Sequence, residues 1–169
     1  LKEAKKILRE DDPIYPEVCF HLGYCYYSRG VQWYNQAITE MVEALKAKED
    51  FSKAHYYLGA MYFRTKQYQK ALSHLRRVKG PDEDKAIFMA GMSSWRLGDY
   101  ESAERSLRKA VELAATPDDK SEYISALQEL IDEMAKKERA MSKIVRVKLD
   151  PIFAAFPSYY AQNPIGTAT

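Results

Sequence analysis

The chain has 169 residues, and its 26 Lys and Arg against 24 Asp and Glu leave a formal charge of only +2. So small a charge excludes an overall field strong enough to make nucleic acid or an anionic membrane the main partner. The length suits one domain with at most a tail. Turn residues are scarce, with 7 Gly and 7 Pro, which favours long helices over a β-sandwich or a barrel.

Three stretches of the chain repeat one pattern of small and large residues. Each has a glycine after an apolar residue: Leu22-Gly23, Leu58-Gly59 and Ala90-Gly91. Each then has a tyrosine three residues before an alanine: Tyr34-x-x-Ala37, Tyr68-x-x-Ala71 and Tyr100-x-x-Ala103. The glycines are 36 and 32 residues apart, so the underlying period is 34. Because glycine has no Cβ, these positions predict helices that approach one another closely.

A 34-residue period with these motifs resembles the tetratricopeptide repeat. The resemblance implies an all-α fold, a right-handed α-solenoid of helix pairs. Its repeats are expected at 16–50, 51–81 and 82–115, after the second helix of a preceding repeat at 1–13. Two extra residues near Val31–Trp33 lengthen the turn of the first repeat. We expect Trp33 to pack against a neighbouring helix, the alternative being contact with a partner.

A long capping helix is predicted at 117–148, after the repeats. Thr116-Pro117-Asp118-Asp119 is typical of a helix start, since it combines a capping hydroxyl, a first-turn proline and acidic residues. The stretch 136–148 is basic, and we interpret it as a solvated helix face. Beyond Asp150, three prolines at 151, 157 and 164 predict an extended, aromatic-rich tail over 149–169.

The two cysteines, Cys19 and Cys25, are six residues apart, which places them on nearly opposite sides of one helix. They are therefore poorly placed to form a disulfide. We predict two buried thiols in reducing surroundings, which favours a cytoplasmic protein. The chain starts at Leu1 in the middle of a pattern, so we expect it to be a fragment of a longer protein.

The resemblance also implies a binding groove, because the first helix of each repeat lines the concave face in tetratricopeptide-repeat proteins. The inward positions of this chain are rich in aromatic residues and methionine, and such exposed apolar surfaces mark interaction sites. The alternative is that these side chains pack as ordinary core. The predicted groove residues are Phe20, His21, Tyr24, Tyr27, Tyr56, Tyr57, Phe63, Arg64, Lys85, Phe88, Met89, Met92, Trp95 and Arg96.

The expected ligand of this groove is an apolar helix or an extended peptide. It would come from a protein partner or from the chain's own tail at 151–164, in cis or from a second copy. The carboxylate clamp that the family uses for acidic chaperone termini is missing, since only Lys85 matches its five positions. A terminal carboxylate without those donors would be unpaired, which disfavours an immunophilin-like co-chaperone.

Enzyme motifs do not occur in the sequence: there is no phosphate-binding glycine loop, no nucleophile elbow and no paired metal-ligand spacing. We therefore predict a scaffold or adaptor for protein–protein interaction, without catalysis, cofactor or metal. The competing class is a nucleic-acid- or anionic-lipid-binding module that uses the basic stretch 136–148, whose affinity would fall steeply with salt.

Overall fold

The computed structural model describes the backbone of residues 1–162 and the side chains of residues 1–142, and these residues are all helix, turn or loop. The chain divides into two compact units, the first comprising Leu1–Gln128 and the second beginning at Glu129. No helix among the described residues is long and apolar enough to cross a membrane. The expected all-α fold is confirmed.

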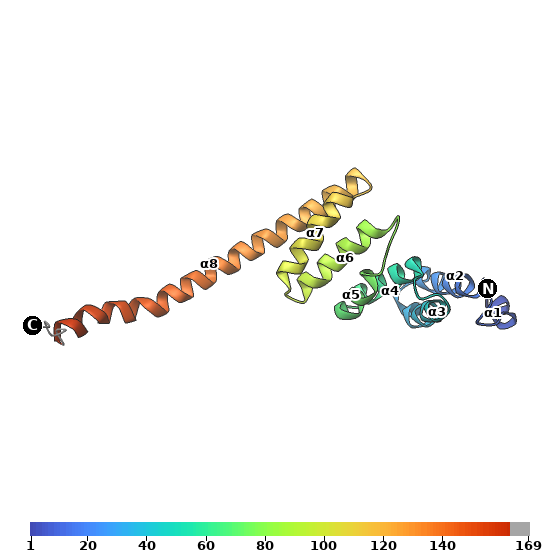
Figure 1. Ribbon diagram of the computed structural model, residues 1–169, viewed down its shortest axis with the longest axis horizontal. Coiled ribbons are helices and arrows are strands. Elements are labelled where there is room, and N and C mark those ends of the chain that lie inside the picture. The colour runs from blue at the N-terminus through green and yellow to red at the C-terminus, as the bar shows by residue number, and fades with distance from the viewer. Residues whose placement is uncertain (163–169) are drawn as a thin grey trace, which may run out of the picture. The chain divides into compact units, whose positions relative to one another are not determined.

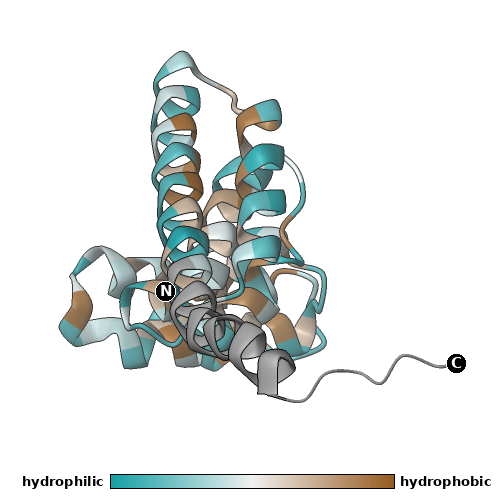
Figure 2. Ribbon diagram, turned by 90° about the vertical axis from the view of Figure 1, so that its left-hand side faces the viewer, coloured by the Kyte–Doolittle hydropathy of each residue, from teal (hydrophilic) through white to brown (hydrophobic). Residues whose placement is uncertain are grey.

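Helices follow one another as pairs in chain order (Figure 1). After the short α1 (Lys2–Ile7), α2 (Tyr15–Ser28) pairs with α3 (Tyr34–Ala47). The second pair is α4 (Ser52–Arg64) with α5 (Tyr68–Leu75), and the third is α6 (Glu83–Arg96) with α7 (Tyr100–Leu113). The last helix, α8, spans Pro117–Gln162 and begins in the first unit. Teal and brown segments alternate along most helices in Figure 2, as expected of amphipathic helices.

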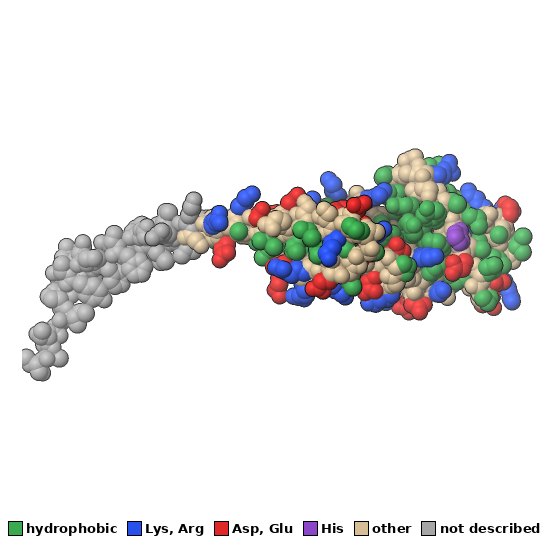
Figure 3. Space-filling model, turned by 90° about the horizontal axis from the view of Figure 1, so that it is seen from above, with side chains coloured by type: hydrophobic (Ala, Val, Ile, Leu, Met, Phe, Trp, Pro, Cys, Tyr) green, Lys and Arg blue, Asp and Glu red, His purple; other side chains and the backbone are tan. Residues whose placement is uncertain are grey.

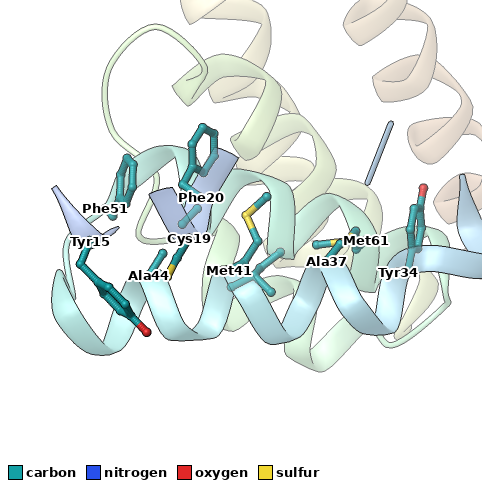
Figure 4. Packing of buried hydrophobic residues seen from close by; sticks show 11 residues of the cluster. Tyr15, Cys19, Phe20, Tyr34, Ala37, Met41, Ala44, Phe51 and Met61 are labelled. Atoms are coloured by element: carbon teal, nitrogen blue, oxygen red, sulfur yellow. The ribbon is translucent and has the colours of Figure 1, made fainter. Parts of the chain in front are cut away.

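Small residues let the two helices of each pair approach closely. Ala37, Ala71 and Ala103 are fully buried at the crossings. A Cβ placed on Gly59 would lie 2.5 Å from Leu75 Cδ2 and 2.6 Å from its Cγ, so α4 and α5 have no room for even a methyl group there. Around the first crossing, Met41 of α3 lies between Ala37 and Ala44, facing Cys19 of α2 (Figure 4). The repeated glycines therefore set the helix spacing.

The lengthened turn of the first repeat forms a short 3-10 helix, η1 (Val31–Trp33), after Gly30, whose φ of 104° suits glycine. Trp33 stacks on Tyr26 of α2, with ring centroids 5.8 Å apart, and the Arg29 guanidinium lies 3.8 Å from the Trp33 ring centroid. Trp33 thus packs within the molecule, which is the first of the two expected alternatives.

The start of α8 is anchored on α6 by a buried polar contact. Tyr123 is 2% exposed and stacks on Phe88 of α6 at a centroid distance of 4.4 Å. Its hydroxyl donates to Asp84 Oδ2 at 3.4 Å, and the backbone N–H of Ala115 donates to the same oxygen at 3.3 Å. Thr116 Oγ1 accepts from the N–H of Asp119, so the predicted cap of this helix is present.

The expected lengths of the first and last helices are wrong. α1 ends at Ile7, because acidic residues 10–12 are unfavourable at a helix C-terminus and the Asp12 carboxylate accepts from the N–H of Ile14 in a turn. α8 continues to Gln162, so the tail is not extended over 149–162. A proline removes one helical hydrogen bond and bends a helix without always ending it, and Ala154 and Ala155 between the prolines favour helix. Residues 163–169 lie outside the described residues.

The expectation of two buried thiols is half wrong. Both cysteines are free, as expected, and Cys19 is buried in the core of the first pair, but Cys25 is exposed. The six-residue offset that separates them on α2 turns one toward α3 and the other away from it.

The buried His55 and the half-buried His74 form a pair between α4 and α5. His55 Nδ1 and His74 Nδ1 are 3.0 Å apart, and His55 Nε2 is 2.9 Å from the Glu49 carbonyl oxygen. Since a carbonyl only accepts, His55 donates from Nε2 and accepts at Nδ1, while His74 donates from Nδ1. Burial, followed by the neighbouring His55, lowers the pKa of His74 to about 4, and burial also lowers the pKa of His55.

We predict that Gly59→Ala lowers the free energy of unfolding by about 1–3 kcal/mol, because the added methyl group overlaps Leu75, which is itself buried. Gly91→Ala, where the nearest atoms are 3.0 Å away, is expected to lose less. Urea unfolding followed by circular dichroism measures both. A Gly59→Ala variant as stable as the parent would contradict this account, since alanine is the better helix former.

We predict that stability falls as the pH drops from about 6.5 towards 4. The lowered folded-state pKa values of His55 and His74 mean that the unfolded chain binds protons first in this window, so the histidines' contribution is complete above pH 6.5 and is lost below it. The loss should be about 2 kcal/mol. His74→Gln should flatten the slope between pH 6.5 and 5, and the exposed His21→Gln should leave it unchanged. Equal slopes in all three proteins would refute the prediction.

Candidate functional site

One cluster of aromatic rings joins the first and second helix pairs, and we call it the aromatic patch. On α2, Phe20, Tyr24 and Tyr27 recur at intervals of four and three residues, which puts them on one helix face. Neighbouring rings come from α3 and α4. The patch comprises Phe20, Tyr24, Tyr27, Tyr34, Tyr56 and Tyr57.

Tyr57 of α4 is the centre of the aromatic patch. Its ring centroid lies 5.2 Å from Tyr24 and 5.1 Å from Tyr27, both in edge-to-face geometry. It also lies 5.8 Å from Phe20 and 5.3 Å from Tyr56. These separations lie within the range in which aromatic pairs attract one another. Burial, followed by the charges of its tyrosine neighbours, raises the pKa of Tyr57 to about 12, so the hydroxyl stays neutral.

Arg64 at the end of α4 borders the aromatic patch. Its Nη1 donates to the Tyr34 hydroxyl at 3.1 Å, and its guanidinium carbon lies 5.7 Å from the Tyr27 ring centroid. Tyr27 and Tyr34 stack nearly parallel, with centroids 5.6 Å apart. Arg64 is otherwise exposed, so it supplies a positive charge at one edge of an apolar surface.

A shallow hollow of about 210 Å³ lies beside Phe20, Tyr24 and Tyr57. Its rim carries opposite charges, Lys53 on α4 and Asp82 before α6, together with the exposed His21. Figure 3 shows hydrophobic side chains gathered on one face over the α2 and α4 region. Tyr24 is 41% exposed, which leaves much of its side chain available to a partner.

The remaining predicted groove residues do not extend the aromatic patch as a single open surface. Phe63 and Met89 pack against the buried core of the second and third repeats. Phe88 is covered on one face by Tyr123 of α8, so the expectation of an open groove at this position is wrong. Arg96 lies over the ring of Trp95 at 5.7 Å, Met92 is half-buried, and Lys85 is exposed.

Three contributors were missed by sequence reasoning. Phe51 packs on Phe20 with centroids 5.1 Å apart, and it lies one residue before α4, outside the inward helical positions. Tyr34 was assigned only to the repeated Tyr-x-x-Ala motif. Asp82 sits in the link before α6, where no periodicity applies. Only Tyr34 carried a signal, because a large aromatic next to the inserted turn has to pack against something.

The chemistry of the patch is that of a contact surface. It offers ring faces, tyrosine hydroxyls and single charges of both signs. Among the described residues, no three His, Cys, Asp or Glu side chains gather closely enough to hold a metal ion.

Comparison with known proteins gives two matches. The family described as anaphase-promoting complex, cyclosome, subunit 3 matches residues 31–110, which are 80 of the 169 residues. The solved N-terminal domain of stress-induced protein-1 (STI-1) from C. elegans superposes with a TM-score of 0.58 at 15% identity, covering 68% of this chain and 93% of that one. No curated protein sequence matches.

We predict that Tyr57 and Tyr24 differ in how much they contribute to the stability of the fold. Tyr57→Ala should lower the free energy of unfolding by about 2–4 kcal/mol, because it removes the ring that four others contact. Tyr24→Ala should cost less than about 1 kcal/mol, since surface substitutions act weakly. Denaturant midpoints measure both, and similar losses for the two variants would contradict the assignment of Tyr57 as the centre.

Proposed function

Because the chain belongs to the tetratricopeptide-repeat family, we propose that it is a protein–protein interaction scaffold whose aromatic patch holds an apolar helix or an extended peptide. One observation carries the proposal: Tyr24 is 41% exposed and contacts the half-buried rings of Tyr27 and Tyr57. Phe20 and Tyr34 are buried, so they support these rings as part of the core. Burying an apolar surface of this kind against a partner is favourable, because it removes apolar area from water.

The construction of the patch supports tight rather than adaptable binding. Tyr57 is fixed by its ring neighbours and Tyr34 by the guanidinium of Arg64. A surface that is already ordered loses little side-chain entropy on binding. Tyrosine and arginine are also the residues that most often dominate interface energies. The chain would therefore act through a few aromatic anchors, with Lys53, Arg64 and Asp82 setting orientation at the edge.

The matched family is named for a subunit of a multiprotein complex, and the chain's repeats are consistent with such an assembly role. A separate peptide is our preferred occupant over the chain's own segment 151–164. The case for that segment depended on prolines holding it extended, whereas residues 151–162 belong to α8. The side chains of Phe153, Phe156, Tyr159 and Tyr160 lie outside the described residues.

The two competing readings have less support. For the basic stretch 136–148, Lys136, Lys137 and Arg139 are exposed, but Lys137 already pairs with Glu133 at 3.6 Å. The side chains of its other three basic residues, Lys143, Arg146 and Lys148, lie outside the described residues. A co-chaperone role would need donors for a terminal carboxylate, and the clamp positions hold rings instead, Phe20, Tyr24 and Tyr57.

The test uses a display library of random 15-residue peptides selected on the full chain. We expect enriched peptides to carry large apolar side chains, and Tyr24→Ala to weaken their binding at least tenfold, since a lost aromatic anchor costs more than about 1.4 kcal/mol. Leu97→Ala is the matched control, because Leu97 is also 41% exposed but lies at the end of α6, outside the patch.

The salt dependence of the affinity distinguishes binding to the aromatic patch from binding through phosphate charges. Affinity for these peptides should change less than about threefold between 50 and 300 mM salt, whereas binding through phosphates would fall steeply. Peptides that bind equally well to the Tyr24→Ala and Leu97→Ala variants would contradict the proposed surface. A chain that selects no peptide but binds RNA or anionic vesicles would contradict the proposed function itself.

A further inference from the structure

The second helix of the second repeat is unusually short. Tyr34 and Tyr68 begin α3 and α5 at equivalent positions, 34 residues apart, yet α3 has 14 residues and α5 only 8. α7, the equivalent helix of the third repeat, also has 14 residues. After Leu75 the chain turns away through Gly80, whose φ of 93° suits glycine, and Pro81. Almost two helical turns are therefore missing beside α7.

A pocket of about 220 Å³ lies where these turns are missing, bordered by α5, α6 and α7. Its floor is apolar and comes from both sides of the link: Leu72 and Leu75 of α5, Val78 of the link, and Ile87 and Ala90 of α6. Leu75 and Val78 are almost fully buried, so the floor is fixed by the core beneath it. The shortened helix thus leaves a formed hollow.

Four cationic side chains surround this apolar floor: Arg76, Lys79, Arg105 and Lys109. Lys79 pairs with Glu83 at 3.5 Å and Arg105 with Glu101 at 2.9 Å. Within the described part of the chain, neither Arg76 nor Lys109 has an ion-pair partner. Glu83 is the one acidic residue that lines the pocket, and Asp99, outside the lining, interacts electrostatically with Arg76 and Arg105. The rim still has more positive than negative charge around an apolar centre.

The pocket lies on the opposite face of α6 from the predicted groove. Its α6 residues are Glu83, Ile87, Ala90 and Ser94, which fall on one stripe at about 100° per residue. Phe88, Met92 and Trp95 fall on the stripe roughly opposite. A ligand in the pocket would therefore leave the aromatic patch free.

We propose that this pocket is a second docking site, and that its occupant is an acidic peptide that inserts one large apolar side chain. The charges of the rim favour carboxylates on either side of the inserted residue, with Arg76 and Lys109, which form no ion pair within the described residues, as their partners. The volume is below the roughly 300–1,000 Å³ of small-molecule sites and suits a single Leu, Ile, Met or Phe. A phosphate or lipid headgroup is disfavoured in the centre, because most of the floor is apolar and only the hydroxyls of Ser94 and Ser106 offer donors besides the cationic rim.

The experiment selects random 12-residue peptides by display on the full chain carrying Tyr24→Ala, which removes binders of the aromatic patch. We expect enriched sequences to combine Asp or Glu with one aliphatic or aromatic residue. Lys109→Glu should weaken the best peptide at least tenfold in fluorescence anisotropy. Arg108→Glu, the neighbouring change of equal charge, should weaken it less than threefold, because Arg108 pairs with Glu104 outside the pocket.

A second variant tests the apolar half of the site. Ala90→Leu, introduced into the chain with Tyr24 intact, places a larger side chain in the pocket without altering charge and should abolish binding of the pocket-selected peptide. Circular dichroism and the binding of patch-selected peptides to the same variant report that the fold persists. Peptides without acidic residues, or equal effects of Lys109→Glu and Arg108→Glu, would overturn the proposal. The proposal would also be overturned if no peptide bound and phosphatidylserine vesicles bound instead, with binding lost in the Lys109→Glu variant. Failure of the proposed function is detected separately, because Tyr24→Ala would then not weaken the peptides selected on the unmodified chain.

Discussion

The close approach of the two helices within each pair is the constraint on which the rest of the structure depends. At Gly59 a single added methyl group would overlap Leu75, and at Gly23 and Gly91 the nearest atoms are 3.0 Å from where a Cβ would lie. Because the paired helices are this close, their inner faces are filled by alanine, leucine and methionine. Aromatic rings pack within a pair near the helix ends, as Tyr27 does on Tyr34, and also where one pair meets the next, as Tyr24 does on Tyr57.

Both proposed surfaces lie where one helix pair meets the next. The aromatic patch forms where α2 of the first pair meets α4 of the second, and Tyr57 fills the space between Tyr24 and Tyr27. The second proposed site, the pocket bordered by α5, α6 and α7, forms between the second and third pairs. There α5 ends early, beside a floor to which Leu72 and Ala90 contribute. One surface is aromatic with few charges, and the other is cationic around an apolar hollow. A scaffold with two such faces can hold two different segments at once.

The sequence predicted what depends on local pattern. Glycine and alanine recurring at spacings of 32 to 36 residues identified the helix pairs. The resemblance to the tetratricopeptide repeat placed Phe20, Tyr24, Tyr27 and Tyr57 at inward positions, and their rings do contact one another. Features that depend on packing between distant segments were not predictable. The ring of Phe88 is covered by Tyr123, 35 residues further on, through a contact with buried Asp84 that no motif marks. The continuation of α8 past Pro151 was also not predicted. A proline weakens a helix, but the helix propensity of the neighbouring residues also decides whether it ends there.

Tyrosine ring signals give the most direct test of the central claim, that the aromatic patch is where a partner binds. The full chain, labelled with ¹³C in its tyrosine rings, is titrated with a selected apolar peptide, and Tyr→Phe variants assign the signals. The account predicts that the signals of Tyr24, Tyr27 and Tyr57 shift on binding while that of Tyr68, on α5, stays in place. Patch signals that do not move while the peptide is bound would contradict it.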